Sequence, residues 1–469
     1  MNSKLVSLFC CLIMLVSFSG CTKVTQLVKD NQPTKAELLA EINEEHQRWE
    51  AAPAADPTPY LRHYDDPADA QKYFDYVTDT YSEYNAAKEL SLEEAEEDVN
   101  YLFDAFYYDF AFYDYFGGHT VFDQAKAEIL QELQAKDNLT CKDLQEVLVK
   151  HLTFIKDGHF NINHNFPAEK EIPFFFRQVM FVKTDSGYQD SKGKTVVSVD
   201  GHPDLDTLFK RSISQEGYLV YYPVLLKEAK FDGTEWDKHV CDEQLTVHYA
   251  DGSTDVLTAD TWSQYYKDLP KGQNTDLRQT DGIPVFQFNH FDPSFLEETN
   301  AAAAQMSNAE ISMLDLRSNV GGYEEVAHQW FNRYSHQRVF GTGVRYSVLP
   351  ASLVASPSTS KTPRASNDNI LILLSGKCSA SCAEITLDLS YNLDNSLIIG
   401  ENTNGSMISN SGHIELPNSK CSVDMTFSTV YLTPDGFDYF EELRGFFPDI
   451  WVPAKEAETL AAKLMENLK

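Results

Sequence analysis

The chain has 469 residues, 42% hydrophobic and 12% aromatic, which is enough to bury a substantial core and long enough for two or three domains. Its 71 acidic residues against 38 basic ones give a formal charge of −33. Such a surface repels phosphate backbones, and no basic cluster is dense enough to offset it. Nucleic acid is therefore excluded as an expected partner.

The first residues have the features of a secretion signal. Lys4 precedes an apolar run over residues 5–18, and small residues then lead to Cys21. The run is short for a membrane-spanning helix, which needs about 20 residues. It resembles a bacterial lipoprotein signal peptide, which implies that residues 1–20 are removed and that Cys21 carries lipid. An outer-membrane anchor facing the periplasm is expected, with surface exposure left open; an uncleaved anchor is the alternative.

Five cysteines remain beyond Cys21, namely Cys141, Cys241, Cys378, Cys382 and Cys421. An odd number at irregular spacing describes neither a disulfide framework nor a zinc site. At most one or two bridges are expected, and no metal or other cofactor.

The chain divides into segments of different character. Residues 21–60 are polar with a Pro/Ala-rich stretch and are expected to be a tether. Residues 61–165 are expected to form a helical domain, because Ser91 opens a capping box and Thr140 starts a second apolar stripe. The aromatic residues over 101–116 are expected in its core, with a ligand-binding box as the alternative.

The second half changes pattern twice. Residues 166–280 show short β-type runs between turn signals and predict a small β-rich module, with a helix over 204–213. Residues 281–469 alternate strands with helices, which predicts an α/β domain. A Ser/Pro-rich loop is expected over 350–367. The fold class is therefore α/β and multi-domain.

Ser381 is the candidate nucleophile. An apolar strand over 371–374 is followed by a turn and by a helix from Ala383, so Ser381 falls at a helix N-terminus, where N–H groups and the helix dipole favour negative charge. The Cys382 amide could donate there to an oxyanion. The plainer alternative is a serine that only caps the helix, and Cys378 and Cys382 are rival nucleophiles.

A serine hydroxyl needs a base, most often histidine. His159 is the candidate because it follows a glycine and begins a strand-like run. His159 and His164 as metal ligands are disfavoured, because five positions apart on a strand they face opposite sides.

A glycine pair, Gly321 and Gly322, follows the apolar strand that ends in Asp315-Leu316-Arg317. Small residues there would let backbone amides approach a substrate carbonyl and hold an oxyanion. A simple turn between strand and helix is the alternative.

These segments together resemble the carboxy-terminal processing (tail-specific) proteases and the tricorn core protease. The resemblance covers about residues 98–453 and rests on the order His, Asp-x-Arg-x-Asn-x-Gly-Gly, Ser-x-x-Glu, Gly-Glu-x-Thr and Gly-x-x-Pro-Asp. It implies a catalytic domain of the crotonase and Clp protease type, and it makes a PDZ-like domain one candidate for the β-rich module.

The resemblance also implies roles for residues. The tail-specific branch has a catalytic lysine where this chain has Ser406, so a Ser-Lys dyad is not available at that position. The tricorn-like branch uses histidine and a glutamate, here His159 and Glu442, with Glu441 as a neighbouring alternative. Gly158 replaces the serine that the tricorn protease has beside its histidine.

The sequence therefore predicts a serine peptidase that cuts peptides or proteins through an acyl-enzyme in the cell envelope. The predicted triad is Ser381, His159 and Glu442, with Gly321, Gly322 and Cys382 at the oxyanion. The alternative is a catalytically inactive peptide- or lipid-binding protein on the same fold. Substrate preference and oligomeric state are left open.

Overall fold

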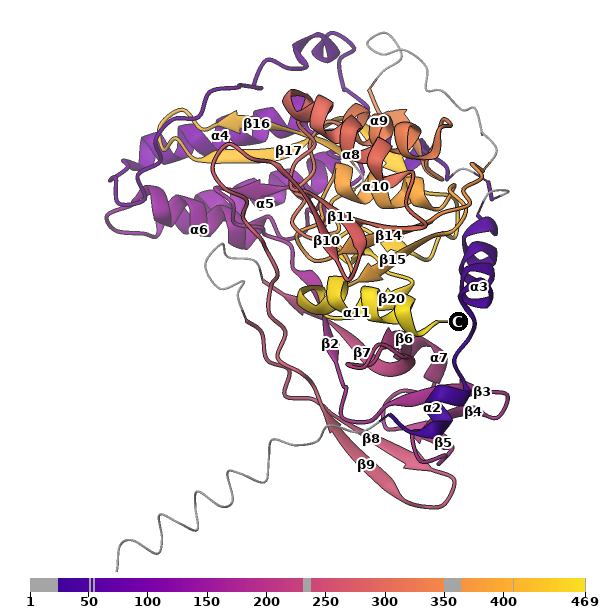
Figure 1. The fold of residues 1–469 in the computed structure, drawn as a ribbon. Helices are drawn as coiled ribbons and strands as arrows, with labels where there is room; N and C mark the ends of the chain where they lie inside the picture. Colours follow the sequence, from indigo (N-terminus) through magenta and orange to yellow (C-terminus); the bar gives the residue numbers. More distant parts are fainter. Residues whose placement is uncertain are drawn as a thin grey trace, which may run out of the picture.

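The computed structural model describes residues 24–49, 52–53, 55–230, 238–349, 364–407 and 409–468. The chain forms a helical part, a β-rich part and an α/β part (Figure 1). This confirms the predicted mixed α/β class. The predicted signal peptide, Cys21 and most of the expected loop over 350–367 lie outside the described residues. Among the described helices, none is both long enough and apolar enough to cross a lipid bilayer.

A six-stranded sheet forms the centre of the α/β part. Its order is β10 (Thr275–Thr280), β11 (Ile283–Phe288), β12 (Ile311–Asp315), β14 (Ile370–Ser375), β15 (Ser396–Gly400) and β20 (Ile450–Trp451). The strands from β11 onward pair in parallel, and β10 is antiparallel. Strand β14 is buried throughout, as expected for a parallel strand covered on both faces. Asp315 pairs with Leu374, so the carboxyl ends of β12 and β14 lie side by side.

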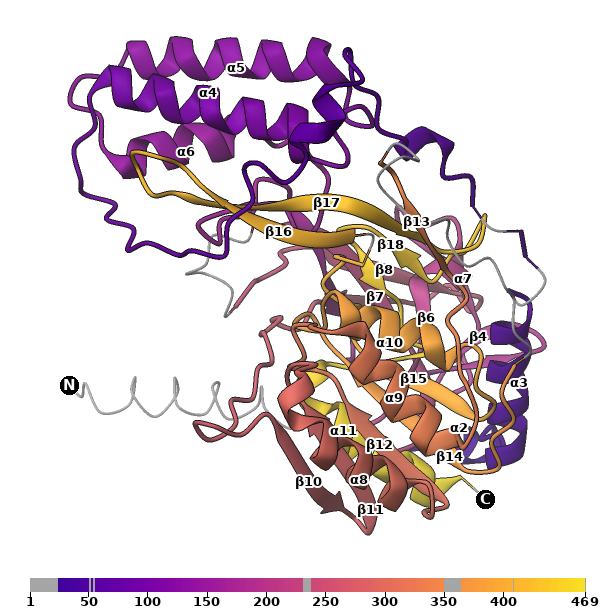
Figure 2. The ribbon, with the colours of Figure 1, turned by 90° about the horizontal axis from the view of Figure 1, so that it is seen from above.

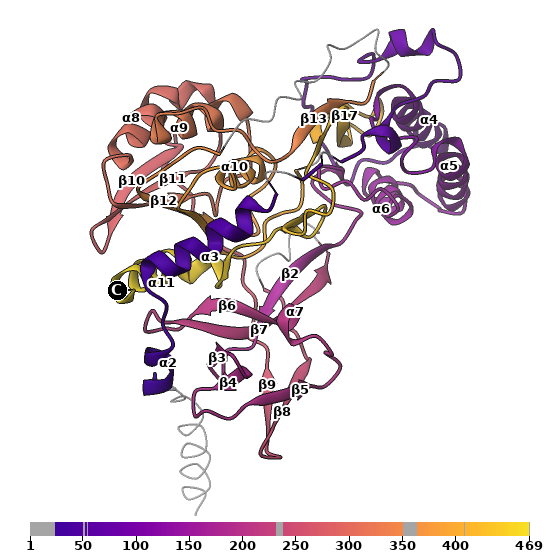
Figure 3. The ribbon, with the colours of Figure 1, turned by 90° about the vertical axis from the view of Figure 1, so that its right-hand side faces the viewer.

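Helices cover both faces of this sheet (Figure 3). One face carries α8 (Leu296–Met306), α9 (Glu324–Ser335) and α10 (Cys382–Ser390). The other carries α11 (Ala454–Asn467) and α3 (Lys35–Gln47). Because side chains of a strand alternate, Leu371 and Leu373 pack on the first face, and Ile372 and Leu374 on the second.

The helical part consists of α4 (Leu92–Asp109), α5 (Gly118–Gln134) and α6 (Cys141–His151). The predicted helix starts are confirmed: Ser91 and Glu94 form one capping box, and Thr140 and Asp143 form another. Within the aromatic stretch over 101–116, the phenylalanines Phe103, Phe106 and Phe110 are core residues, as expected, whereas Tyr115 is exposed.

A long hairpin joins the helical part to the α/β part. Its strands are β16 (Ser409–Glu415) and β17 (Ser422–Leu432), which lie beside the three helices (Figure 2). Strand β13 (Val344–Ser347) pairs with one end of β17, and β1 (Asn161–Ile162) pairs with it further along. The pairing of β1 brings the segment that carries His159 to the α/β part.

The β-rich part, without residues 231–237, which are not described, contains eight strands: β2 (Lys170–Phe175), β3 (Phe181–Thr184), β4 (Gly187–Asp190), β5 (Val196–Val199), β6 (Phe209–Ile213), β7 (Leu219–Ala229), β8 (Gln244–Tyr249) and β9 (Thr254–Thr258). One sheet runs β2-β7-β3-β4 with β6 on β7, and the other runs β5-β8-β9. The predicted helix over 204–213 is wrong: α7 is only Leu205–Leu208. Strand β6 follows it, because pairing with β7 buries Phe209 and Ile213.

The described residues of the stretch expected to be a tether include two α-helices, α2 (Gln26–Asp30) and α3. Helix α3 starts at a capping box formed by Thr34 and Glu37, and it buries Leu38 and Ile42 against the sheet. The segment is polar in overall composition, so the narrow apolar stripe on one face of α3 was not recognised from the sequence. The segment that follows the expected lipidation site is therefore docked on the folded body over Lys35–Gln47.

The Asp315-x-Arg317 motif has a structural role. Arg278 and Arg317 both donate to Asp315 and to Glu458 of α11, at 2.6 to 2.8 Å between Nη2 and a carboxylate oxygen. These bonds tie α11 to the ends of β10 and β12. Although burial opposes the charge, hydrogen bonds from Arg278 and Thr280 lower the pKa of Glu458 to about 2.

Glu458→Gln should lower the free energy of unfolding at pH 7 by about 2 kcal/mol, because the folded state holds the carboxylate more strongly than the unfolded chain. A lowered pKa stabilises above the unfolded value near 4.5, and this stability is lost as pH falls toward about 2. Urea unfolding at pH 7 and pH 3 should therefore show a deficit that shrinks in acid. Glu466→Gln, exposed on the same helix, should change stability by less than about 0.5 kcal/mol. An equal deficit at both pH values would contradict the charge argument.

Candidate active site

Ser381 lies between strand β14 and helix α10, directly before the first residue of the helix. Its backbone has φ 55° and ψ −119°, which a residue with a side chain rarely adopts. Such strain costs on the order of 1–3 kcal/mol and clusters at functional sites. A strained strand-to-helix turn is also how hydrolases of another fold expose a nucleophilic serine. The N-terminus of α10 adds N–H groups and partial positive charge beside the hydroxyl.

The turn after strand β12 packs against Ser381. Asn319 fixes this turn, because its side-chain oxygen accepts from Gly321 N at 2.8 Å and its carbonyl accepts from Ala380 N at 3.0 Å. A β-carbon on Gly321 would lie 2.8 Å from Ser381 Cβ and 3.3 Å from the Cys382 nitrogen, and φ there is 103°. Only glycine therefore fits where the two turns meet.

The predicted oxyanion donors differ in whether their N–H groups already donate a hydrogen bond within the protein. The N–H of Gly321 already donates to Asn319 Oδ1. The Gly322 backbone forms a hydrogen bond to the Cys382 thiol, whereas no backbone bond from the Cys382 N–H is present in the described part of the chain. The Cys382 amide is therefore the donor that is free for an oxyanion next to Ser381, and the Gly322 amide would have to exchange its partner.

Glu384 of α10 connects the nucleophile turn to the Gly-Glu-x-Thr segment. Its carboxylate accepts from the backbone nitrogens of Ser381 at 3.1 Å, Gly405 at 2.7 Å and Ser406 at 2.8 Å, and from the Thr403 hydroxyl. Burial raises the pKa of Glu384, and these donors oppose that effect. The glutamate of Ser-x-x-Glu thus shapes the backbone around the nucleophile.

His159 and Glu442 come together from distant parts of the chain. Ligand atoms of Asp157, His159 and Glu442 all lie within 4.8 Å of one another. Glu442 Oε1 accepts from Gly158 N at 2.8 Å, and Asp157 Oδ1 accepts from His159 N at 2.9 Å. Burial lowers the pKa of His159 and raises that of Glu442, so burial favours the neutral form of each. A neutral imidazole is the form that can take a proton.

The carboxylates around His159 accept hydrogen bonds from protein donors. Asp157 Oδ2 accepts from the Thr426 hydroxyl, while Oδ1 accepts from the His159 backbone, and Glu442 accepts from the Gly158 N–H. These bonds fix the backbone of the loop that carries His159, and their geometry resembles a cation site as well, because one ligand atom from each of the three residues lies within 4.8 Å of the others. His164, the other histidine considered as a ligand, is not part of this cluster.

The nucleophile segment and the histidine segment meet at Gly405 and Ser406. Gly405 O accepts from Leu443 N at 2.9 Å, next to Glu442, and Ser406 Oγ donates to Gly158 O at 2.9 Å. Glu384 binds the nitrogens of both residues from the other side. The predicted triad residues thus lie on segments in contact, and the bond between the Ser381 hydroxyl and the imidazole remains a prediction.

Gly158→Ala should reduce kcat/KM by on the order of 100-fold, as expected when a catalytic group is displaced by about 1 Å. A β-carbon at this position would lie 2.0 Å from Gly405 O and 2.8 Å from Glu442 Oε1. The loop must therefore shift, and His159 with it. Steady-state kinetics at the pH optimum, with circular dichroism to confirm folding, measure the effect. Gly193→Ala, where a β-carbon meets nothing within 4 Å, is the control. Unchanged kcat/KM in Gly158→Ala would show that this packing is unimportant.

The rival cysteine nucleophiles have protonated, buried thiols. Burial raises the pKa of Cys378 to about 11 and that of Cys382 to about 12. Cys378 Sγ accepts from Gln264 Nε2 at 3.0 Å, and Cys382 Sγ donates to Gly322 O at 2.7 Å. Because the thiolate is the reactive form, neither is a good nucleophile at neutral pH. None of the five cysteines of the described chain is in a disulfide.

Sequence reasoning missed Lys170 and the roles of Asp157 and Glu384. The last two belong to motifs that were recognised, and their contacts depend on the folded chain. Lys170 lies between two glutamates in the sequence, a pattern typical of a solvent-exposed surface. Its side chain is nevertheless wholly buried. No sequence signal distinguishes it.

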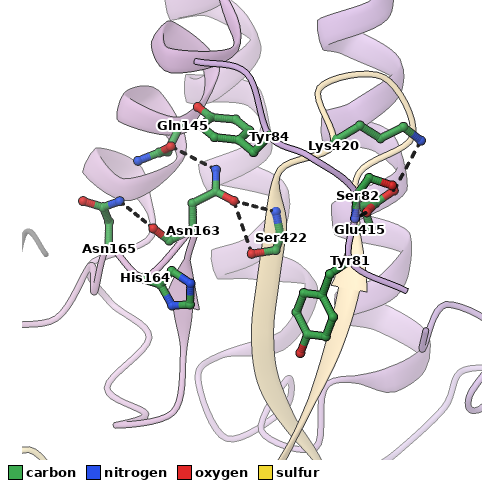
Figure 4. Close-up of a pocket in the computed structure, with 10 residues that line it drawn as sticks. All are labelled: Tyr81, Ser82, Tyr84, Gln145, Asn163, His164, Asn165, Glu415, Lys420 and Ser422. Carbon is green, nitrogen blue, oxygen red and sulfur yellow. Dashed lines mark hydrogen bonds and ion pairs between the residues drawn. The ribbon is translucent and has the colours of Figure 1, made fainter. Parts of the chain in front are cut away.

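A separate hollow of about 420 Å³ lies on the side of the helical part (Figure 4). Its polar groups bind one another: Asn163 Nδ2 donates to Gln145 Oε1, Ser422 N donates to Asn163 Oδ1, and Glu415 accepts from Ser82. None of its lining residues belongs to the candidate site. With its polar groups already paired, this hollow offers few free groups to a ligand.

Residues 283–452 match the model of peptidase family S41. Similar solved structures include mature CPAF complexed with lactacystin, at 14% identity over 80% of this chain and 97% of that chain, with a TM-score of 0.42. The photosystem II D1 C-terminal processing protease matches at 13% identity over 80% and 99% of the chains, with a TM-score of 0.37.

A putative S41 protease from Bacteroides fragilis NCTC 9343 matches at 13% identity over 69% of this chain and 90% of that chain, with a TM-score of 0.35. No curated protein matches the chain.

The strained serine at a helix N-terminus, the glycine turn facing it and the family match define a serine-type peptidase. The similarity to peptidase family S41 covers residues 283–452. The predicted resemblance, the peptidase activity and the hydrolase class are thereby confirmed.

Proposed function

We propose that the protein is an endopeptidase or C-terminal processing peptidase that cuts peptide bonds through an acyl-enzyme on Ser381, with His159 as the base and Glu442 as its partner. The strained backbone of Ser381 beside the glycine turn carries this proposal. It fits the strand-to-helix turn of a nucleophile, and a serine that only capped a helix would not need it.

In the proposed mechanism, His159 takes the proton of the Ser381 hydroxyl while Oγ attacks the carbonyl carbon of the peptide. The N–H groups of Gly322 and Cys382 hold the oxyanion. The imidazolium then gives its proton to the leaving amine, and the C–N bond breaks. Water then attacks the ester carbonyl while His159 takes a proton from it. The imidazolium returns a proton to Ser381 Oγ as the bond between Oγ and the acyl carbon breaks.

The surface next to the nucleophile suits a polypeptide substrate. Val320 and Tyr323 flank the glycine pair and are 51% and 63% exposed. Exposed apolar side chains beside a reactive centre provide packing for substrate side chains. Peptides or unfolded proteins are therefore the substrates proposed, and membrane contact is proposed through a lipid on Cys21.

The lipid anchor has its own test. Metabolic labelling with a radioactive or alkyne-bearing fatty acid should mark the wild-type protein in its native bacterium and not Cys21→Ser. Fractionation should then place the wild type with the outer membrane. Helix α2 begins at Gln26 and buries Val28 against residues of the β-rich part. A lipid on Cys21 would therefore keep the β-rich part near the bilayer.

The activity is tested with purified full-length protein and a peptide library in water enriched in ¹⁸O. Hydrolysis should leave one ¹⁸O in each new carboxyl terminus, detected by mass spectrometry. Matched peptides with free and amidated C-termini distinguish the two modes, since a C-terminal processing peptidase needs the free carboxylate. Peptides that bind but are never cut would favour the inactive binding protein instead.

A further inference from the structure

Lys170, the first residue of β2, places its ammonium inside the candidate site. The side chain is wholly buried. Nζ donates to Gly158 O at 3.0 Å, to Ser406 Oγ at 3.0 Å and to Asn404 Oδ1. An ammonium has three donors, so these three acceptors satisfy it. The lysine therefore joins the histidine loop to the Gly-Glu-x-Thr segment from outside the peptidase sheet.

Charged groups from five elements face this ammonium or its neighbours. Carboxylates come from α10, from the loop before β1, from β17 and from the turn between β18 (Phe440–Glu441) and β19 (Gly445–Phe446), and a second ammonium comes from the loop after β14. The groups are Glu384, Asp157, Asp424, Glu442 and Lys377. Four carboxyl groups therefore face two lysine side chains, and Lys170 is the lysine that bonds directly to the His159 loop through Gly158 O.

The interaction acts on both members of the acid–base pair. Burial lowers the pKa of Lys170 to about 8, so it is mostly charged at neutral pH. The charge of Lys170 opposes the rise in the pKa of Glu442 that burial causes, and it adds to the fall in the pKa of His159. Both effects favour a carboxylate beside a neutral imidazole.

We propose that Lys170 is a positioning residue of the peptidase: its buried ammonium fixes Gly158, Asn404 and Ser406, and its positive charge lies among the carboxylates that surround His159 and Glu442. This inference rests on the proposed function, in which His159 must accept a proton and Glu442 must stabilise the imidazolium. Lys170 contacts neither substrate nor nucleophile in this role.

The test is the pH dependence of kcat/KM for wild type, Lys170→Met and Lys170→Gln. Without the ammonium, the pKa values of both Glu442 and His159 rise, so the acidic limb should move up by about 1 pH unit. The loss should be about tenfold or more at pH 6. It should shrink above pH 8, where Lys170 itself becomes neutral. Thermal melting checks that each variant is folded.

Lys377→Met is the matched control. Lys377 is also a buried lysine, but its Nζ donates to Thr403 O at 2.6 Å and Arg444 O at 3.3 Å. Although Lys377 belongs to the same cluster, the charges that shift the pKa values of His159 and Glu442 come from Lys170 and from carboxylates, so removal of Lys377 should lower stability and leave the acidic limb in place. Because Ser406 Oγ lies 3.0 Å from Nζ, Lys170→Met combined with Ser406→Lys should return the limb toward the wild-type position.

The outcomes separate this inference from the proposed function. An active, Ser381-dependent enzyme whose limb is unmoved in Lys170→Met, or equally moved in Lys377→Met, overturns the role of Lys170 alone. Failure of both Lys170 variants to fold also overturns it, because the ammonium is then a folding element. A wild type without peptidase activity, or one in which Ser381→Ala retains activity, overturns the proposed function and this inference with it.

Discussion

Ser381→Ala should lower kcat/KM by on the order of 10⁵-fold or more, which is the scale of losing the nucleophile in serine peptidases. The fold should be unchanged, because the Ser381 backbone bond to Glu384 does not use the hydroxyl. Alanine also keeps the strained turn. The measurement is hydrolysis of a quenched fluorescent peptide under identical conditions, with melting curves for both proteins.

Cys378→Ala is the control for this prediction, because its thiol is buried and accepts a hydrogen bond from Gln264. It should retain activity within a few-fold of the wild type. If Cys378→Ala lost activity and Ser381→Ala retained it, the assignment of the nucleophile would be wrong.

Glu442→Gln should lower kcat/KM by about 10³- to 10⁴-fold, as for the orienting carboxylate of other serine peptidases. The amide can still accept from Gly158 N, so the geometry of the loop is preserved. It cannot offer a negative charge when His159 becomes an imidazolium. Glu441→Gln, on the exposed neighbouring residue, is the matched control and should be nearly neutral.

The pH profile of the residual activity adds a second readout. In the wild type, the raised pKa of Glu442 puts the acidic limb of kcat/KM above pH 4.5. Glu442→Gln removes that titration and leaves only the titration of His159. A loss below tenfold would mean that Glu442 stays neutral through the reaction and gives the imidazolium no charge stabilisation.

The sequence predicts the elements whose signals are local. The helices after Ser91 and Thr140 begin at capping boxes, and the parallel strands read as continuous apolar runs. The prediction of a helix over 204–213 was wrong because the apolar residues of this segment are compatible with a strand as well as with a helix. The segment forms a strand because it pairs with β7. Helix α3 escaped notice because its stripe is only Leu38, Ile42 and their neighbours.

The candidate site was predictable where chemistry depends on residue type and order, and not where it depends on contacts. Ser381, His159 and Glu442 stand in recognisable motifs. The strain at Ser381 and the occupied N–H of Gly321 are properties of the folded backbone. Lys170 could not be identified, because a lysine between glutamates is usually exposed, and only tertiary packing buries it.

The most direct test of the central claim is covalent trapping with a fluorophosphonate, which reacts preferentially with a serine that a neighbouring base activates. Tryptic mass spectrometry should locate the adduct on Ser381 of the wild type. Labelling should be lost in His159→Gln, which keeps the Ser381 hydroxyl but lacks the imidazole. An adduct on Cys378, Cys382 or another serine, or undiminished labelling of Ser381 in His159→Gln, would contradict the account.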